Sequence, residues 1–273
     1  MTRLRKECMA NMKSLEFCKS ERDGRVFLVT IDRPERMNAL HWKANEELAS
    51  VFDEFEADPE LWVAILTGAG ERAFSAGNDL KYQASEAKGE LRAGPATGFA
   101  GLTARYDMTK PVIAAVNGVA MGGGFEIALA CDLIIASSTA VFALPEPRVG
   151  LAALAGGVHR LPGQIGLKQA MGMLLTGRRV SAEEGQRLGF VNEVVPPGEL
   201  MAAARRWAEQ ILECSPLSVR ATKQATMRGL RHAGVEDAMA ERYPAIAELI
   251  KSQDFIEGPL AFAQKRPPLW KGR

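Results

Sequence analysis

Two glutamates stand in unusually apolar surroundings and are the first candidates for chemistry. Glu126 lies inside a nearly uninterrupted apolar run, and Glu146 lies between two prolines at residues 145–147. An unpaired carboxylate costs free energy in such a setting, so each one needs a partner or a function. Two carboxyls brought together in a dry site gain proton affinity and can share acid and base chemistry.

Other interpretations of the two glutamates stay open at this point. In a second interpretation, each glutamate caps a backbone group or pairs with an arginine such as Arg148 or Arg160, and its role is structural. A glycosidase pair is a third interpretation, although only 7% of the residues are the aromatics that usually bind sugar rings. Spacing alone does not choose among these.

A glycine triplet, Gly122 to Gly124, stands between an expected strand and an expected helix. Free backbone N–H groups at such a helix start can hold an anion or a developing oxyanion. For the triplet alone, however, we favour close packing of helix on sheet. Residues 68–73 fit the dinucleotide pattern G-x-G-x-x-A, but no helix is expected to open there, so we do not expect nicotinamide binding.

Composition excludes several classes of function. The 273 residues include 34 Lys+Arg and 33 Asp+Glu, a formal charge of +1, which argues against duplex nucleic acid as a partner. The cysteines and histidines are scattered, which predicts neither a disulfide framework nor a metal site. The N-terminus lacks the apolar core of a signal peptide. Residues 111–136 contain charges and glycines that are costly in lipid, so we expect a cytoplasmic protein with no membrane partner.

The elements that position these residues alternate between strands and helices. We expect a hairpin over residues 15–31, a helix ending near residue 58, and buried strands at 61–67, 111–116 and 133–136. A helix is expected at 125–130, and a helix and a strand alternate again over residues 174–195. Residues 81–101 are expected to be helical in part and mobile in part. Beyond residue 197 only helices are expected. One carries an apolar stripe of Ala204, Trp207, Ala208, Ile211 and Leu212, the next begins at Ser215-Pro216, and another is broken or kinked at Pro244. This divides the chain into a tail (1–14), a core (15–198) and a helical region (199–273).

Several motifs in order resemble the enoyl-CoA hydratase/isomerase (crotonase) family. Residues 73–81 (AFSAGNDLK) resemble its A-F-[CS]-A-G-x-D-[LI]-K stretch, and residues 117–132 resemble its N-G-x-x-x-G-G-G-x-E-[LI]-A-x-x-[CS]-D stretch. Residues 142–161 and 176–195 resemble two further blocks, and residues 33–40 and 258–270 match the family's two ends. The resemblance implies an α/β fold, a crotonase-like spiral of repeated ββα units with a C-terminal helical trimerisation region. It also implies homotrimers or dimers of trimers, whereas a tail that only closes its own core is the alternative.

The resemblance further implies roles for individual residues. The backbone N–H groups of Asn78 and Gly123 would form an oxyanion hole for the thioester of an acyl-CoA substrate. Glu126 would help to activate a water for attack at C3, and Glu146 would deliver a proton to C2. No metal or other cofactor is implied, because coenzyme A is part of the substrate. The implied CoA or substrate contacts are Arg36, Asn38, Ala39, Ala76, Asp79, Leu80, Gly122, Phe262 and Lys265.

Some details of this assignment depart from the family pattern or admit a second interpretation. Arg36 has a competing interpretation as a solvated surface arginine. Phe262 and Lys265, expected in the C-terminal helix, would reach the CoA of a neighbouring subunit. Asn78 replaces the commoner alanine, and Ala153 stands where many members carry proline, which leaves the acyl preference open.

The sequence therefore predicts an enoyl-CoA hydratase, a hydro-lyase for the reversible hydration of a trans-2-enoyl-CoA to a 3-hydroxyacyl-CoA. The alternatives are a carnitinyl-CoA dehydratase-like lyase and an enoyl-CoA isomerase. A non-catalytic acyl-CoA-binding protein is a further alternative, which the intact pair of glutamates disfavours.

Overall fold

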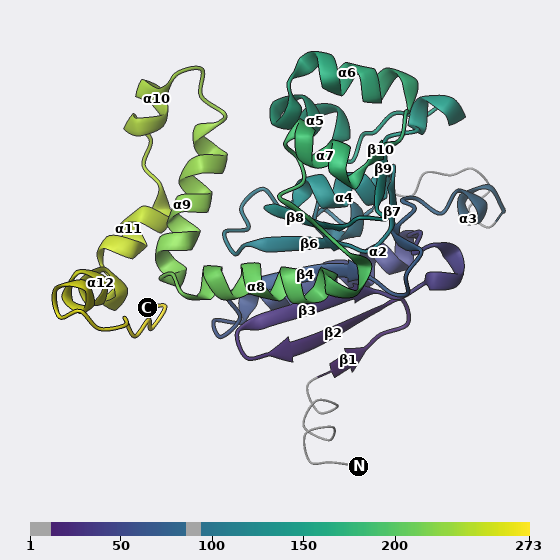
Figure 1. The fold of residues 1–273 in the computed structure, drawn as a ribbon. Helices are drawn as coiled ribbons and strands as arrows, with labels where there is room; N and C mark the ends of the chain where they lie inside the picture. Colours follow the sequence, from purple (N-terminus) through teal and green to yellow (C-terminus); the bar gives the residue numbers. More distant parts are fainter. Residues whose placement is uncertain (1–11, 86–93) are drawn as a thin grey trace, which may run out of the picture.

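A large sheet forms the centre of the described chain, residues 12–85 and 94–273 of this computed structural model (Figure 1). Its strand order is β1-β2-β3-β4-β6-β8-β11. Strands β3, β4, β6, β8 and β11 pair in parallel, whereas β1, β2 and β3 pair antiparallel. The bounds are β1 Met12–Ser14, β2 Cys18–Asp23, β3 Val26–Ile31, β4 Val63–Gly68, β6 Val112–Val116, β8 Leu133–Ser137 and β11 Glu193–Val195.

A second sheet of four short strands has the order β10-β9-β7-β5. These strands are β5 Ala73–Ser75, β7 Val119–Met121, β9 Val141–Ala143 and β10 Val180–Ser181. Along the chain β4, β6 and β8 enter the large sheet, and after each of them β5, β7 or β9 enters the small one before a helix follows. The predicted α/β fold of repeated ββα units is confirmed.

The helices follow these strand pairs and then continue alone to the C-terminus. The bounds are α2 Trp42–Ala57, α3 Leu80–Ser85, α4 Gly123–Ala130, α5 Gly157–Ile165, α6 Leu167–Thr176, α7 Ala182–Leu188, α8 Leu200–Leu212, α9 Pro216–Gly229, α10 Val235–Ala240, α11 Pro244–Ile250 and α12 Gln253–Ala263. Short 3-10 turns are η1 Pro34–Arg36, η2 Phe99–Gly101, η3 Glu146–Val149 and η4 Pro197–Glu199.

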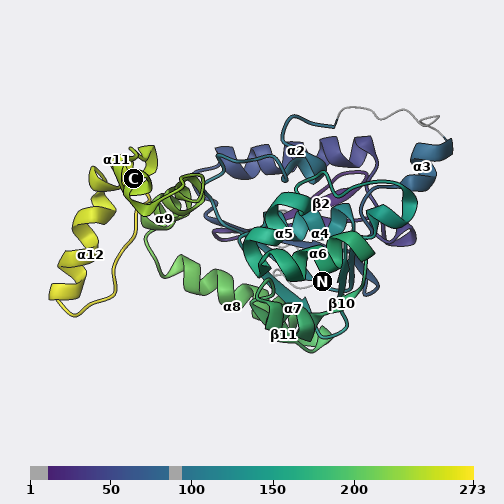
Figure 2. The same ribbon diagram turned by 90° about the horizontal axis from the view of Figure 1, so that it is seen from above.

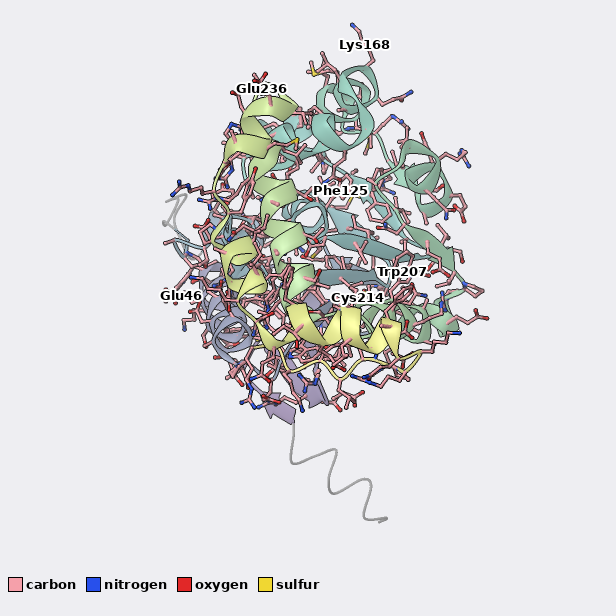
Figure 3. All side chains as sticks on the ribbon, turned by 90° about the vertical axis from the view of Figure 1, so that its left-hand side faces the viewer. Glu46, Phe125, Lys168, Trp207, Cys214 and Glu236 are labelled. Atoms are coloured by element: carbon pink, nitrogen blue, oxygen red, sulfur yellow. The ribbon has the colours of Figure 1, made fainter. Side chains whose placement is uncertain are left out.

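The large sheet has a hydrophobic layer on each face, because side chains alternate along a strand. On one face Ile65 and Ile113 pack with Ala204 of α8, which carries the apolar stripe predicted for this helix. On the other face Leu66 packs in a larger cluster that includes Phe125 of α4. Figure 3 shows Phe125 inside this core and Lys168 of α6 at its outer edge. Burial on both faces explains why β4 and β6 have continuous apolar sequences.

The first strands show one agreement and one difference. The predicted hairpin is β2–β3, with Gly24 at its turn at φ +58°. Met12–Ser14, which we assigned to the tail, pairs instead with β2 as an edge strand. Residues 1–11 of the tail and residues 86–93 of the stretch expected to be part helical and part mobile lie outside the described residues.

The structure also corrects the prediction around the glycine turns. The chain from Val116 to Gly122 contains β7, where we expected only a turn, because a three-residue strand shows no measurable period. After Gly68 the chain continues to β5, and no helix begins between them. The dinucleotide pattern at residues 68–73 therefore lacks the helix start that would hold a pyrophosphate.

The C-terminal helices extend away from the two sheets as an arm. Seen from above, α9, α11 and α12 lie well to the side of the core (Figure 2). Ser215 caps α9 with its hydroxyl, as predicted. Pro244 is the first residue of α11, so the predicted break separates α10 from α11. The all-helical character of the chain beyond residue 197 is confirmed.

Candidate active site

The start of α4 lies against the turn that follows β5, which brings together two glycine-rich segments. A β-carbon added to Gly77 would lie 2.6 Å from the Met121 carbonyl oxygen and 2.7 Å from the Gly123 nitrogen. A β-carbon on Gly124 would lie only 2.0 Å from the Ser75 carbonyl oxygen. The glycines are therefore required for backbone to approach backbone. The close approach of the two backbones supports the packing interpretation of the triplet, and the oxyanion interpretation is compatible with the same geometry.

Two backbone N–H groups remain without an acceptor where these segments meet. Neither the N–H of Asn78 nor that of Gly123 donates to any group within the described chain. The neighbouring groups are used, since Gly122 donates to the Ala143 carbonyl and Asp79 to the Leu40 carbonyl. The Asn78 side chain turns away and donates to Gln83 at 2.6 Å. A ligand oxygen at this helix start would find donors and the positive end of the helix dipole.

Glu126 lies on the buried side of α4, one turn after Gly123, and only 3% of its surface is exposed. Its Oε1 accepts a hydrogen bond of 2.8 Å from the N–H of Gly157, the first residue of α5. Burial, opposed by the Gly157 hydrogen bond and assisted by the nearby charge of Glu146, raises the pKa of Glu126 to about 7. The carboxyl can therefore take and give a proton near neutral pH.

Glu146 begins the turn η3 and lies close to the start of α4. A β-carbon on Gly122 would lie 2.9 Å from Glu146 Oε1, so the carboxyl lies directly against the start of α4. Its Oε2 is buried and has no hydrogen-bond partner in the described part of the chain. Burial raises the pKa of Glu146 as well. An unsatisfied buried carboxyl oxygen is uncommon in a purely structural residue and marks a functional one.

The competing structural interpretation of the glutamates holds only in part. One oxygen of Glu126 does cap a backbone N–H, that of Gly157. Neither arginine that we considered as a partner forms an ion pair with a glutamate of the site. Arg148 donates to the Thr176 carbonyl, and Arg160 donates to the Thr103 carbonyl. The site thus combines two carboxyls of raised pKa with two free N–H donors around one helix start.

Glu126→Gln is expected to increase stability at high pH. A carboxyl whose pKa is higher in the folded protein stabilises folding below its unfolded pKa, and this contribution is lost as pH rises through the folded pKa. Between the ordinary value of 4.5 and about 7 the difference corresponds to about 3 kcal/mol. Urea unfolding should therefore find the variant more stable than wild type at pH 8 by up to that amount, with no gain at pH 4.5. A gain that is independent of pH would contradict the raised pKa.

The predicted CoA-binding segments lie side by side. Residues 37–40 run beside residues 76–79, with hydrogen bonds from Ala76 N–H to the Met37 carbonyl and from Leu40 N–H to the Gly77 carbonyl. Arg36 at the end of η1 and Leu80 at the start of α3 are exposed, whereas Ala39 is buried and Ala76 half-buried. The structure therefore joins these predicted residues to the turn that carries Asn78.

The side chains of Asn38 and Asp79 serve the fold of these segments. Asn38 is fully buried at φ +54°, accepts from Arg33 N–H, and donates to the carbonyls of Ala69 and Ala73. Asp79 accepts from Arg33 at 3.2 Å and from the N–H of Tyr82 in α3. Their predicted contact with CoA is therefore left to backbone atoms and stays a prediction.

Asn38→Ala is expected to lower the free energy of unfolding by about 3 kcal/mol, because the Arg33 N–H and the Ala69 carbonyl lose this partner, the Ala73 carbonyl keeps only its bond from Asn117, and alanine disfavours positive φ. Asn38→Asp keeps the acceptor for Arg33 but places a buried carboxylate oxygen against the Ala69 and Ala73 carbonyls, so it should lose at least as much. Urea unfolding at pH 7 measures both. Equal stability of Asn38→Ala and wild type would show that these bonds do not hold the segment.

The structure does not bring Phe262 and Lys265 to the site. Phe262 is 87% exposed on α12, and Lys265 follows that helix rather than lying in it, at φ +53°. Both belong to the arm, which is separate from the sheets in Figures 1 and 2. Their contact with a neighbouring subunit's substrate stays a prediction.

Several residues of the site were not predicted from the sequence. Gly157 supplies the hydrogen bond to Glu126, and the ring of half-buried Phe99 lies where a β-carbon on Gly123 would be, 2.5 Å from its nearest atom. Buried Arg33 joins the two CoA-binding segments through Asp79. The pair Gly156-Gly157 was the available signal for the first, but nothing in the sequence pattern indicated Phe99 or Arg33.

Within residues 12–85 and 94–273, no three His, Cys, Asp or Glu side chains gather as a metal site would require. In the same residues no helix combines the length and the apolar character needed to cross a bilayer.

Comparison with known proteins gives consistent matches along the chain. The model of the enoyl-CoA hydratase/isomerase family matches residues 21–273. The carnitinyl-CoA dehydratase of Escherichia coli (strain K12) is 47% identical over 259 residues, covering 92% of this chain and 97% of that protein. The carnitinyl-CoA dehydratase of Salmonella arizonae is 46% identical over 264 residues, covering 94% and 99%.

Solved structures match equally broadly. The enoyl-CoA hydratase from Mycobacterium tuberculosis H37Rv superposes with a TM-score of 0.87 at 39% identity, covering 95% of this chain and 100% of that one. The carnitinyl-CoA hydratase from Mycobacterium avium superposes with a TM-score of 0.74 at 42% identity, with the same coverage.

Proposed function

This chain belongs to the enoyl-CoA hydratase/isomerase family and is a hydro-lyase, and we propose that it catalyses the reversible hydration of a trans-2-enoyl-CoA to a 3-hydroxyacyl-CoA. One observation carries this proposal. Two carboxyls of raised pKa, Glu126 and Glu146, meet two free backbone N–H groups at the start of α4. Hydration of an enoyl thioester needs both, because charge builds on the thioester oxygen while protons move at C2 and C3.

In the proposed reaction, the thioester oxygen accepts hydrogen bonds from the N–H groups of Asn78 and Gly123. These donors stabilise the enolate more than the ground-state carbonyl, since their strength grows with the charge on the oxygen. The dipole of α4 acts in the same sense.

The two glutamates divide the proton transfers. Glu126 takes a proton from a water as its oxygen bonds to C3, and the C2–C3 π electrons move onto the thioester as an enolate. Glu146 gives a proton to C2 as the carbonyl re-forms. One proton is taken and one is given, so no other reactant is consumed. The pKa of about 7 for Glu126 and the raised pKa of Glu146 suit these roles at neutral pH.

The CoA moiety is proposed to lie along the paired segments 36–39 and 76–80. Exposed Arg36 is available for a phosphate, and exposed Leu80 for an apolar contact. Gly122 lies beside Glu146 and would contact the acyl group. No metal or additional cofactor enters the proposed reaction, and a cytoplasmic location remains part of the proposal.

A second candidate substrate is a carnitinyl-CoA, which would make the chain a dehydratase of one specialised acyl group. Relatives with 46–47% identity carry that name, a higher identity than the 39% to the enoyl-CoA hydratase structure. The reaction at C2 and C3 is the same, and the acyl group would end in a quaternary ammonium, a cation that aromatic faces attract. Phe99, half-buried beside Gly123, offers such a face.

A substrate panel tests both candidates. We would compare kcat/KM for crotonyl-CoA, longer enoyl-CoAs and the dehydrated carnitinyl-CoA, following loss of enoyl absorbance, and include a 3-enoyl-CoA for isomerase activity. Turnover of unbranched enoyl-CoAs at least as efficient as that of the carnitinyl substrate supports the first candidate, and the reverse order the second. Binding without turnover of any member would contradict the proposal and indicate an acyl-CoA-binding protein.

We further propose that the chain forms homotrimers or dimers of trimers through its C-terminal arm. The arm leaves large apolar side chains exposed, among them Leu230, Val235, Met239, Ile256 and Phe262. A hollow of about 700 Å³ between α9, α10 and α11 is lined by apolar residues such as Ile246 and Ile250. Apolar surface of this kind marks an interface between subunits. Light scattering that finds only monomers would contradict this proposal.

A further inference from the structure

Arg160, in the first half of α5, connects two segments that both face the candidate active site. Its Nη2 donates to the Thr103 carbonyl at 2.7 Å, and its Nη1 lies 3.5 Å from the Ala155 carbonyl. The Thr103 carbonyl belongs to the segment after η2, and the Ala155 carbonyl to the turn before α5. These residues are 52 positions apart in the chain, so the guanidinium joins parts of the site that the backbone does not.

Each of the joined segments contacts a different functional group. The Ala155 segment continues to Gly157, whose N–H donates to Glu126. The Thr103 segment is fixed to Phe99, because the Thr103 hydroxyl accepts from Phe99 N–H at 2.9 Å. The Phe99 ring in turn packs against Gly123.

These contacts form a closed circuit, since Glu126 and Gly123 are three residues apart on α4. From Gly123 the circuit of contacts leads through Phe99 and Thr103 to Arg160. From Arg160 it leads through the Gly156–Gly157 turn to Glu126. Arg160 is the member that spans the gap between the two loops. Without it, the Gly157 donor and the Phe99 ring would be positioned independently of each other.

The local backbone is shaped to admit a guanidinium at this place. Gly156 has φ +114°, and a β-carbon there would lie 1.9 Å from Arg160 Nη1. Any side chain at residue 156 would thus displace the arginine. The planar fork of a guanidinium reaches two carbonyls at once, which the single ammonium of lysine does less well. The charged groups that act on Glu126 in the described chain are Glu146 and Arg160.

We propose that Arg160 is a positioning residue that holds Glu126 and the Phe99 ring in register with the oxyanion donor Gly123. This inference rests on the proposed function for the roles of Glu126 and Gly123. Arg160 itself touches neither substrate nor reacting atoms in this assignment, and acts through Gly157 and Thr103.

The test compares Arg160→Gln and Arg160→Lys with Arg22→Gln, a control that removes an arginine of β2 paired with Asp58 at 2.9 Å. Arg160→Gln should lower kcat by about 100-fold, the usual cost of a misplacement near 1 Å, with a much smaller change in KM. Arg160→Lys should recover part of kcat. Because lysine keeps the positive charge, its pH profile should stay at the wild-type position, while that of Arg160→Gln moves to higher pH.

A readout that needs no turnover separates this inference from the proposed function. Glu126 is titrated by 13C NMR of side-chain-labelled glutamate in the full-length wild type and in both variants, with Glu126→Gln to assign the signal. The midpoint should rise in Arg160→Gln and stay in Arg160→Lys. If Arg160→Gln does not fold, the partial kcat of Arg160→Lys still decides the geometric role. An active wild type whose Arg160 variants keep its kcat and its Glu126 titration would overturn the inference alone, whereas an inactive wild type would count against the proposed function.

Discussion

Glu126→Gln is expected to lower kcat by about 10³-fold, the range typical of losing a general base. The amide is isosteric and its oxygen can still accept from Gly157 N–H, so the turn before α5 should keep its position. The amide cannot take a proton from water at neutral pH, which removes the step assigned to Glu126. KM should change little, because the proposed CoA contacts lie in other segments. Steady-state hydration kinetics at pH 7 measure both constants.

The same experiment includes Glu146→Gln and a control. Glu146→Gln should fall within a similar range, and the double variant should be little worse than either one, because the two carboxyls act on a single reaction coordinate. Glu184→Gln, a half-buried glutamate paired with Arg178, should keep wild-type activity. Activity retained by both single variants at Glu126 and Glu146 would refute the acid–base assignment.

Gly77→Ala is expected to lower kcat/KM by about 100-fold, comparable with the loss of one oxyanion donor. Gly77 has φ +83°, and its β-carbon would collide with the Met121 carbonyl oxygen at 2.6 Å and the Gly123 nitrogen at 2.7 Å. Both contacts are to backbone, which cannot rotate away as a side chain would. The chain must therefore move, and the distance between the N–H groups of Asn78 and Gly123 must change.

Gly166→Ala is the matched control for this substitution. Gly166 has φ +82°, and a β-carbon there would meet nothing within 4 Å. It shares the positive φ without the collision, so it should lose stability, by about 1–3 kcal/mol, and keep its activity. Thermal unfolding and hydration kinetics on both variants separate the effects. Equal activities of the two variants would mean that the approach of residue 77 to Gly123 does not matter for catalysis.

Local sequence patterns predicted the elements that have enough residues to show a pattern. The continuous apolar runs of β4 and β6, the Asp-Gly turn of the first hairpin and the Ser-Pro start of α9 each depend on neighbours a few residues apart. Strands β5, β7 and β9 were missed because three residues do not show a period of two. The family resemblance implied repeated ββα units, but the order of the strands was known only from the structure, since pairing between distant segments leaves no local signal.

The residues of the candidate site also fall into those that the sequence indicated and those that only the structure explained. Apolar surroundings singled out Glu126 and Glu146 in the sequence, because an isolated carboxylate in an apolar run needs an explanation. Their roles, and those of Asn78 and Gly123, were suggested by motif resemblance. The side chains of Asn38 and Asp79 turned out to hold the backbone, which depends on contacts with Ala73 and Arg33, more than 30 residues away in each case.

The sequence by itself determined which residue types stand at the site, where the glycines permit unusual backbone, and which runs must be buried. Tertiary structure alone decided that Glu146 lies against Gly122, that two N–H groups stay free, that the pKa of Glu126 rises to about 7, and that Arg160 joins two loops. The physical reason is the distance along the chain over which each kind of interaction acts. Backbone preference and hydrophobic burial act within a few residues and are written in local patterns, whereas desolvation and hydrogen bonding depend on which distant segments packing brings together.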